Sequence, residues 1–242
     1  MALTKAMIMT AFAAPDKSSQ DNSASRPAAV HEEVYQRLRR AIISGQLEPG
    51  RALSVRGLAA EFGVSAMPAR EAIRQLAAQG ALEITPTRRV AVARMTKVKL
   101  DELCDARLAL EPSLAGRAVN APPAAREALA AKLTDIDEAL DQAIGRGDSA
   151  DYAKYNSEFH FTLYEAAEAP VYLGLVESLW LQTGPFMRVV IGRLGTSSLD
   201  DDKHKEIVAA LRAGDAAKLE VAVREDIMQG MSNIVRGYSP DV

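Results

Sequence analysis

Apolar residues recur every three or four positions on both sides of Gly63, which predicts two short helices joined by a tight turn. Ser54 and Ser65 stand where these helices would begin, and a serine hydroxyl caps the free N–H groups of a first turn. The outer side of the second helix carries Arg70 and Arg74, one turn apart. A helix with a basic outer face, packed across another helix, is typical of a helix-turn-helix that enters a DNA major groove. The alternative is an ordinary helical hairpin with solvated arginines.

The residues on either side of this pair extend the pattern. Residues 34–43 form an amphipathic helix, and residues 81–85 and 90–93 have the composition of two short strands. The tip between these strands carries two adjacent cations, Arg88 and Arg89. Three helices and a basic-tipped hairpin predict a winged helix, in which the wing arginines lie against phosphates or in a minor groove.

From Lys99 onward the helical spacing continues almost without a break, and no alternating strand pattern occurs. We therefore expect an all-helical bundle of about six helices and a mainly α fold. Pro112 predicts a kink in the first of these helices, and Gly184-Pro185 predicts an interruption of the fourth. The expected segments are a disordered arm over residues 1–29, a winged helix-turn-helix over 30–96, the bundle over 97–237 and a tail over 238–242.

Charge is divided unevenly between the two modules. Residues 30–98 contain 11 Lys+Arg against 6 Asp+Glu, whereas residues 99–242 contain 15 against 24. A basic module joined to an acidic one fits DNA binding by one part only. Cys104 is the single cysteine, which excludes a disulfide framework, and no apolar run is long enough to cross a membrane. We expect a cytoplasmic protein with no membrane partner.

Most of residues 31–95 match one motif with specific spacing: Val34-Tyr35, Leu38, Ile42, Gly45, Pro49-Gly50, Leu58-Ala59, Gly63-Val64-Ser65, Pro68 and Arg70-Glu71-Ala72. This motif resembles the DNA-binding domain of GntR-type bacterial transcription regulators. The resemblance implies DNA contacts from Arg56, Ser65 and Arg70, with help from the wing. Two departures predict a changed set of base contacts, since Ala66 replaces a frequent arginine and the wing tip lacks its usual glycine. The residues expected to face DNA are Arg56, Ser65, Arg70, Arg74, Thr87, Arg88 and Arg89.

The bundle has a looser resemblance, carried by Arg107-Leu108-Ala109-Leu110-Glu111-Pro112, the segment from Asn156 to His160, and the segment from Lys203 to Ile207. These segments resemble the FadR-like branch of the same family, over about residues 98–235. The effector domain of that branch, called FCD, is a helical bundle around a ligand pocket. In many members an acidic residue and three histidines hold a divalent metal. The resemblance places that set at Asn156, His160, His204 and Asp226.

Spacing along the chain favours one shared site for these four side chains. Asn156 and His160 are four residues apart and therefore share a helix face. His204 and Asp226 stand about 15 and 18 Å from the turn at Gly214, so they lie at nearly one level. Two imidazoles and a carboxylate suit zinc, nickel or manganese, with an amide oxygen as a weak fourth ligand. The alternative is a metal-free pocket lined by hydrogen-bonded polar residues.

Arg107 is the candidate for effector binding. The resemblance implies that this arginine faces the pocket, and its guanidinium fits a carboxylate through two parallel hydrogen bonds. That chemistry predicts a small organic acid as the effector. The alternative is an internal salt bridge with Glu111, one helical turn further on.

These features together predict a ligand-responsive, DNA-binding transcription regulator that acts as a homodimeric repressor on a double-stranded operator. Two other classes stay open from the sequence. The histidines and aspartate suggest a metal-dependent enzyme, although no nucleophile–base pairing is evident, so we expect no enzyme activity. An architectural DNA binder without an effector is the other class.

Overall fold

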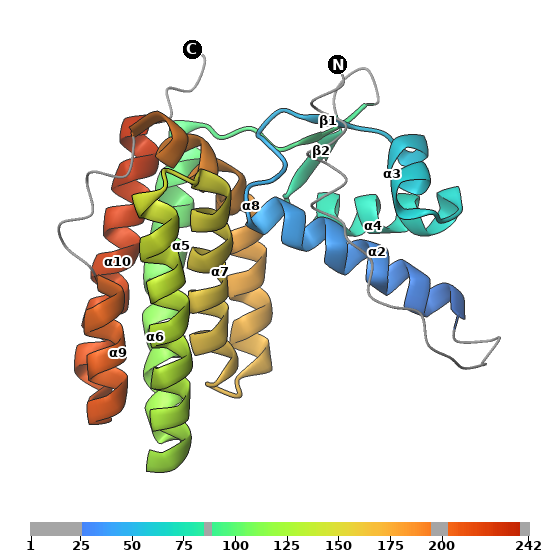
Figure 1. The fold of residues 1–242 in the computed structure, drawn as a ribbon. Coiled ribbons are helices and arrows are strands. Elements are labelled where there is room, and N and C mark those ends of the chain that lie inside the picture. The colour runs from blue at the N-terminus through green and yellow to red at the C-terminus, as the bar shows by residue number, and fades with distance from the viewer. Residues whose placement is uncertain (1–25, 85–88, 195–202, 238–242) are drawn as a thin grey trace.

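Two helical units make up the described part of the chain, which is residues 26–84, 89–194 and 203–237 of the computed structural model. Figure 1 shows a small unit beside a taller bundle, with helix α2 reaching from one to the other. The remaining residues lie outside this description. They include most of the expected arm, the wing residues Thr87 and Arg88, and the expected tail.

The smaller unit is a winged helix, as the sequence predicts. Its sheet is antiparallel in the order β1-β3-β2, and the two predicted strands are β2 and β3. Strand β1 contains only two residues, too few for an alternating pattern to show in the sequence. The elements are α2 (Arg26–Ile43), β1 (Ala52–Leu53), α3 (Val55–Phe62), α4 (Ala66–Ala78), β2 (Leu82–Ile84) and β3 (Val90–Val92).

Of the two predicted serine caps, the one at the start of α3 is observed and the one at the start of α4 is not. The Ser54 hydroxyl accepts a hydrogen bond from the backbone N–H of Gly57 at 3.0 Å, so Ser54 caps α3. Gly63 ends that helix with a φ of 65°, in the left-handed region that glycine adopts without strain. Ser65 precedes α4 as expected but forms no side-chain cap hydrogen bond, so the predicted cap is wrong there. Its hydroxyl therefore stays available for other partners.

The start of α2 corrects the expected limit of the arm. The helix begins at Arg26, so residues 26–29 are helical rather than part of a disordered segment. A proline at the first positions of a helix loses no intrahelical hydrogen bond, and Pro27 stands there. Two alanines follow it, and alanine is the strongest helix former.

The larger unit contains six α-helices within the described residues, as predicted. No helix of this part of the chain is long and apolar enough to cross a membrane. The helices are α5 (Lys97–Gly116), α6 (Pro123–Gly145), α7 (Ser149–Glu165), α8 (Pro170–Leu194), α9 (Lys203–Ala213) and α10 (Ala216–Gly237), with the short 3-10 helix η1 (Arg117–Asn120) after α5.

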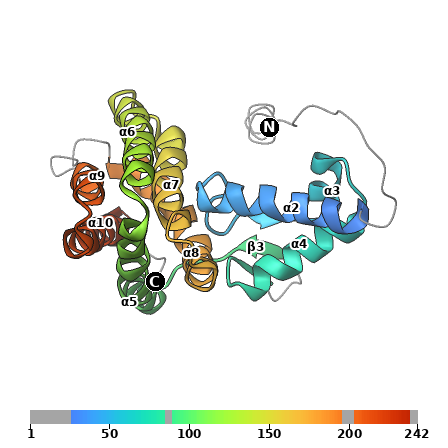
Figure 2. The ribbon, with the colours of Figure 1, turned by 90° about the horizontal axis from the view of Figure 1, so that it is seen from below.

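Helix α8 runs through Gly184-Pro185, so the predicted interruption is wrong. The glycine serves packing instead of ending the helix. A Cβ added at Gly184 would overlap the carbonyl oxygen of Ile43, at the C-terminal end of α2. The bare backbone at Gly184 therefore lets the two units approach closely. Figure 2 shows this end of α2 meeting α7 and α8.

One buried apolar cluster joins the two units. It extends from Leu38 and Ile42 in α2 to Trp180 and Phe186 in α8, and on to Ile227 in α10. All five side chains are at most 2% exposed. Because the cores are continuous, the winged helix is packed on the bundle rather than tethered to it by a linker alone.

Candidate DNA-binding surface and effector pocket

The residues predicted to face DNA are exposed wherever the structure describes them. Arg56 lies in the first turn of α3, and Ser65, Arg70 and Arg74 lie at or on α4. Arg89, just before β3, is exposed as well. Thr87 and Arg88 lie outside the described residues. These positions lie in or beside α3, α4 and β3, the elements that face DNA in a winged helix.

The two arginines of α4 differ in their surroundings. The Nε of Arg74 donates to both carboxylate oxygens of Glu71 at 3.1 Å, so part of its charge is neutralised. Arg70 forms no ion pair with the described residues. Met67, which the sequence analysis did not single out, is 69% exposed in the first turn of α4. An exposed apolar side chain there can contact a thymine methyl group.

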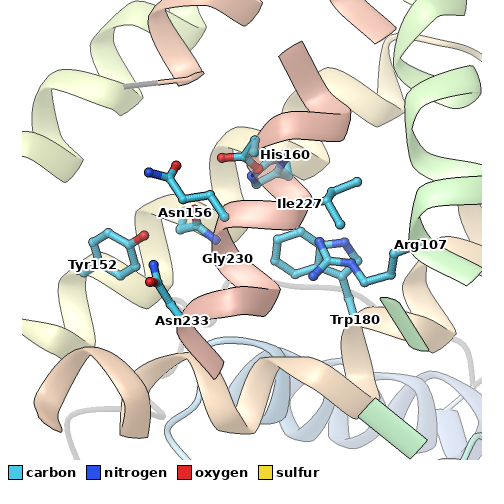
Figure 3. Close-up of a pocket in the computed structure, with 10 residues that line it drawn as sticks. Arg107, Tyr152, Asn156, His160, Trp180, Ile227, Gly230 and Asn233 are labelled. Atoms are coloured by element: carbon cyan, nitrogen blue, oxygen red, sulfur yellow. Dashed lines mark ion pairs between the residues drawn. The ribbon is translucent and has the colours of Figure 1, made fainter. Parts of the chain in front are cut away.

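A pocket opens between α5, α7, α8 and α10 in the bundle. Figure 3 shows Tyr152, Asn156 and His160 along one side and Arg107 beside the Trp180 indole on another. The sequence predicted that Asn156, His160 and Arg107 face a common pocket, and the structure places all three in its wall. Helix α10 completes the lining with Asp226, Ile227, Gln229, Gly230 and Asn233.

Three of the four predicted metal ligands meet beside this pocket. One donor atom from each of His160, His204 and Asp226 lies within 4.8 Å of the others. Oδ2 of Asp226 is 3.2 Å from Nε2 of His160, and Oδ1 is 3.7 Å from Nε2 of His204. Both imidazoles are buried, while the Asp226 side chain is 18% exposed. Helices α7, α9 and α10 thus bring together residues far apart in sequence, with Asn156 one turn before His160.

Asp137 orients the second histidine, and the sequence analysis missed it. Its Oδ1 lies 2.9 Å from Nδ1 of His204, and both side chains are buried. A carboxylate that accepts from Nδ1–H fixes the tautomer and turns Nε2 toward Asp226. The signal was present in the sequence, because Asp137 occupies an apolar face of α6 between Leu133, Ile136 and Leu140. A carboxylate in such a position needs a buried partner.

Asp226 is ionised in this setting. Burial alone would raise the pKa of its carboxyl, but the Nε2–H of His160 donates to the carboxylate at 3.2 Å, and His204 and Arg107 lie nearby. These neighbours hold the pKa of Asp226 at about 2, below its usual value. A carboxylate that faces two Nε2 atoms is a donor set that fits a divalent metal such as zinc.

Arg107 is already paired within the protein. Its Nε and Nη2 donate to the two carboxylate oxygens of Glu111 at 2.5 and 3.1 Å. Glu111 is completely buried and also accepts from the Tyr164 hydroxyl at 2.7 Å and from Nε1 of Trp180 at 3.1 Å. The internal salt bridge is therefore the observed arrangement. Nη1 of Arg107 donates to Sδ of Met231 at 3.7 Å, and a thioether sulfur is a weak acceptor.

Comparisons with known proteins identify both units. Residues 30–92 match the family model described as "Bacterial regulatory proteins, gntR family", and residues 102–228 match the model of the FCD domain. The chain belongs to the GntR family. The resemblances found in the sequence, including the FadR-like branch with its FCD domain, are confirmed.

Individual relatives of this GntR-family chain are transcription regulators. The Escherichia coli K12 protein named HTH-type transcriptional regulator McbR is 27% identical over 210 residues, which cover 86% of this chain and 93% of McbR. A probable D-xylose utilization operon transcriptional repressor of Paenarthrobacter nicotinovorans is 31% identical over 190 residues, which cover 77% of this chain and 80% of that repressor. The solved structure of E. coli McbR/YncC superposes with a TM-score of 0.78, at 26% identity, over 87% of this chain and 99% of that one.

These matches decide between the classes that the sequence left open. The GntR family and its FCD branch consist of DNA-binding transcription regulators, so the chain is a regulator and not a metal-dependent enzyme.

Proposed function

We propose that this chain is a cytoplasmic, homodimeric repressor whose operator binding changes when a small carboxylate enters the pocket of the bundle together with a divalent metal. The observation that carries this proposal is the convergence of His160, His204 and Asp226 to within 4.8 Å. An effector-independent architectural DNA binder would have no use for buried imidazoles directed at one carboxylate.

His160, His204 and Asp226 would hold the metal, with Asn156 as a weak fourth ligand. Zinc, nickel and manganese all accept two imidazoles and a carboxylate. Such an ion supplies positive charge and open coordination positions for a carboxylate ligand. Asp137 supports this function by orienting His204, as second carboxylates do in established metal sites.

The pocket lining favours a small, polar effector. Beyond the metal ligands it presents the hydroxyl of Tyr152 and the amides of Gln229 and Asn233. The guanidinium of Arg107, whose charge is paired with Glu111, adds N–H donors at the opposite wall. We infer that the effector is an organic acid, with its carboxylate on the metal and its remaining polar groups on these side chains.

The dimer is supported by an apolar stripe on α10 that is exposed among the described residues. Val221, Met228 and Val235 stand seven residues apart, and each is 53% exposed. Residues at this spacing share one helix face, so the three make an apolar line along the bundle. Two symmetric winged helices also give the affinity that a single recognition helix lacks. Sedimentation at micromolar protein concentration tests this, and a monomer that protects one asymmetric site would contradict it.

Elemental analysis tests the metal site directly. Protein dialysed against zinc, nickel or manganese should retain about one equivalent per chain, and His160→Ala should abolish that retention. Retention well below one equivalent, together with unchanged melting of His160→Ala, would make the site an ordinary polar pocket. Operator affinity is then measured with and without metal against a panel of small carboxylates.

The sign of regulation needs a separate experiment. The gluconate operon repressor of Bacillus subtilis, 30% identical over 164 residues, and the D-xylose operon protein are both named repressors. We infer the same sign here. A transcription assay on the native promoter should show less transcript when the protein is added, and more transcript would reverse the assignment.

A further inference from the structure

Trp180 stands between the effector pocket and the winged helix, and it is the only tryptophan of the chain. On the pocket side, its ring centroid lies 4.6 Å from Cζ of Arg107 and 5.1 Å from the His160 ring. Its Nε1 donates to Glu111, and only 2% of the residue is exposed. Arg107, His160 and Trp180 all line the pocket and contact one another, so a ligand that moves Arg107 or His160 also changes the packing of this indole.

Phe161 continues this packing toward the winged helix. Its ring meets the Trp180 ring edge-on, at a centroid distance of 5.4 Å and an interplanar angle of 63°. On its other side, Cζ of Arg39 from α2 lies 5.6 Å from the Phe161 centroid. Three side chains from three helices, α8, α7 and α2, thus form one continuous row from the pocket to the DNA-binding unit.

Arg39 is held by few groups, so its position depends on this row. Its Nη2 pairs with Oε1 of Glu177 on α8 at 2.6 Å. Its Nε is buried and has no hydrogen-bond partner among the described residues. A buried nitrogen without a partner costs free energy, so the position of Arg39 depends on its ion pair with Glu177 and its contact with the Phe161 ring. Movement of Phe161 or Glu177 would therefore change how Arg39 holds α2 against α7 and α8.

Helix α8 also touches the winged helix through its backbone. Gly184 lies against the last residue of α2, Ile43, with no room for a Cβ. Gly80, just after the recognition helix α4, lies so close to Gln182 that an added Cβ would be 2.9 Å from Oε1 of Gln182. The helix that presents Trp180 to the pocket thus bears on the ends of both α2 and α4.

We propose that Trp180, Phe161 and Arg39 couple the effector pocket to the winged helix. This proposal rests on the proposed function, because it requires a ligand in the pocket, and it adds the side chains through which occupancy reaches DNA. A ligand that shifts the indole repacks Phe161 and changes how Arg39 docks α2 on α8. In a dimer, a small change in that docking alters the fit of the two recognition helices to their half-sites. By linkage, DNA must act back on the pocket by the same factor.

The test measures this coupling factor as the effect of operator DNA on metal binding in the pocket. Ni²⁺ serves as the pocket probe, and the DNA is an operator that the wild-type protein selects from random sequences. Emission of Trp180, which reports only this position, gives the dissociation constant of Ni²⁺ with and without operator. For the wild type we expect the two constants to differ by about 5- to 150-fold, the usual range of coupling between sites.

Two variants interrupt the row without touching a metal ligand. Phe161→Leu removes the ring between Trp180 and Arg39, and Arg39→Met keeps the side-chain stem but removes its charge. Both should bring the ratio to within about twofold of one, while free protein binds Ni²⁺ as the wild type does. Phe62→Leu is the matched control. It removes a ring that also contacts an arginine of α2, since the Phe62 centroid lies 4.7 Å from Cζ of Arg37, but Phe62 lies on α3 and is not part of the row. Its ratio should stay at the wild-type value.

Wild-type coupling in folded Phe161→Leu and Arg39→Met would overturn the proposal, as would loss of coupling in the Phe62→Leu control. If Ni²⁺ does not bind the wild type, the metal part of the proposed function fails and a second readout decides the coupling. Operator alone should then change Trp180 emission in the wild type but not in Phe161→Leu. An unchanged wild-type emission would overturn the proposal on this arm.

Discussion

Nδ1 of His204 lies 2.9 Å from Oδ1 of Asp137, a contact between two buried side chains that are 67 positions apart. It joins α6 to α9 at the candidate metal site formed by His160, His204 and Asp226. The contact fixes which nitrogen of His204 faces Asp226. It also makes Asp137 part of the site, although its own carboxylate lies behind the imidazole rather than beside the other donors.

Replacing Asp137 by asparagine should weaken metal binding without removing any donor atom. Loss of such a supporting carboxylate typically lowers metal affinity by about 10- to 100-fold. Competition with a chromogenic zinc chelator measures the change. Asp141→Asn is the matched control, since Asp141 lies one turn further along α6 and pairs with exposed Lys205 at 3.2 Å. Equal zinc affinity in the Asp137 variant and this control would contradict the orienting role.

Arg70 and Arg89 should affect DNA binding in different ways. Arg70→Ala should weaken operator affinity by about 1–3 kcal/mol if the guanidinium reads a base edge. Arg89→Ala should instead lower the salt slope of binding by about one unit, with little change in sequence discrimination. Fluorescence anisotropy at several salt concentrations separates the two. Arg212→Ala, at an exposed position of α9 in the bundle, should change neither, and equal effects at all three positions would refute this surface.

Breaking the buried Arg107–Glu111 pair should destabilise the fold strongly. Glu111→Gln leaves the Arg107 charge buried without its counter-ion, and such changes cost about 3–5 kcal/mol. Thermal or urea unfolding measures this cost. Asp101→Asn breaks the exposed Lys97–Asp101 pair of the same helix, which should contribute at most about 1 kcal/mol. A Glu111 variant as stable as the Asp101 variant would mean that the network does not support the bundle.

Two glycines of α8 should respond to alanine with opposite signs. Gly174 has open space around its Cα, so Gly174→Ala should stabilise the protein by about 0.4–1 kcal/mol through a more restricted unfolded chain. Gly184→Ala places a methyl group on the backbone of Ile43 and should cost about 1–3 kcal/mol. Unfolding free energies of the pair test the close approach. The same sign for both would contradict it.

Much of the fold follows from local patterns. Helical spacing and the Ser54 cap predict the helix-turn-helix, and continuous apolar periodicity predicts the six helices of the bundle. The interruption predicted at Gly184 is wrong because a glycine can serve tertiary contact as well as helix ending. A sequence pattern does not distinguish a glycine that ends a helix from one that allows a close contact. At Gly184 the distinction depends on how near the backbone of Ile43 lies in the folded protein.

The candidate site was also predictable only in part, because some of its contacts depend on how distant helices pack. His160, His204 and Asp226 could be grouped by helical spacing and by resemblance, and the structure brings them together. Asp137 could not be grouped with them, because nothing along the chain relates the register of α6 to that of α9. Arg107 had two plausible partners in the sequence, and only burial beside Glu111 decides between them.

Replacing Asp226 by histidine should tighten binding of nickel and zinc. The substitution exchanges a carboxylate for a third imidazole, at the position where many members of the family carry a histidine. Imidazole donors favour nickel and zinc over manganese, so the gain should be larger for the first two ions. The variant loses the carboxylate that lies 3.2 Å from Nε2 of His160, so its apo form should also hold His160 less firmly.

The same variant should bind metal with a steeper dependence on pH. A third imidazole must lose its proton before it binds, and its ordinary pKa is near 6.5, so metal binding should fall more steeply as the pH drops below about 6.5. Titration calorimetry with each ion at pH 7.5 and 6.0 measures both effects, with Asp226→Asn as the control that removes the charge without adding an imidazole. Weaker nickel binding by the Asp226→His variant than by the Asp226→Asn variant would show that position 226 is not a metal ligand.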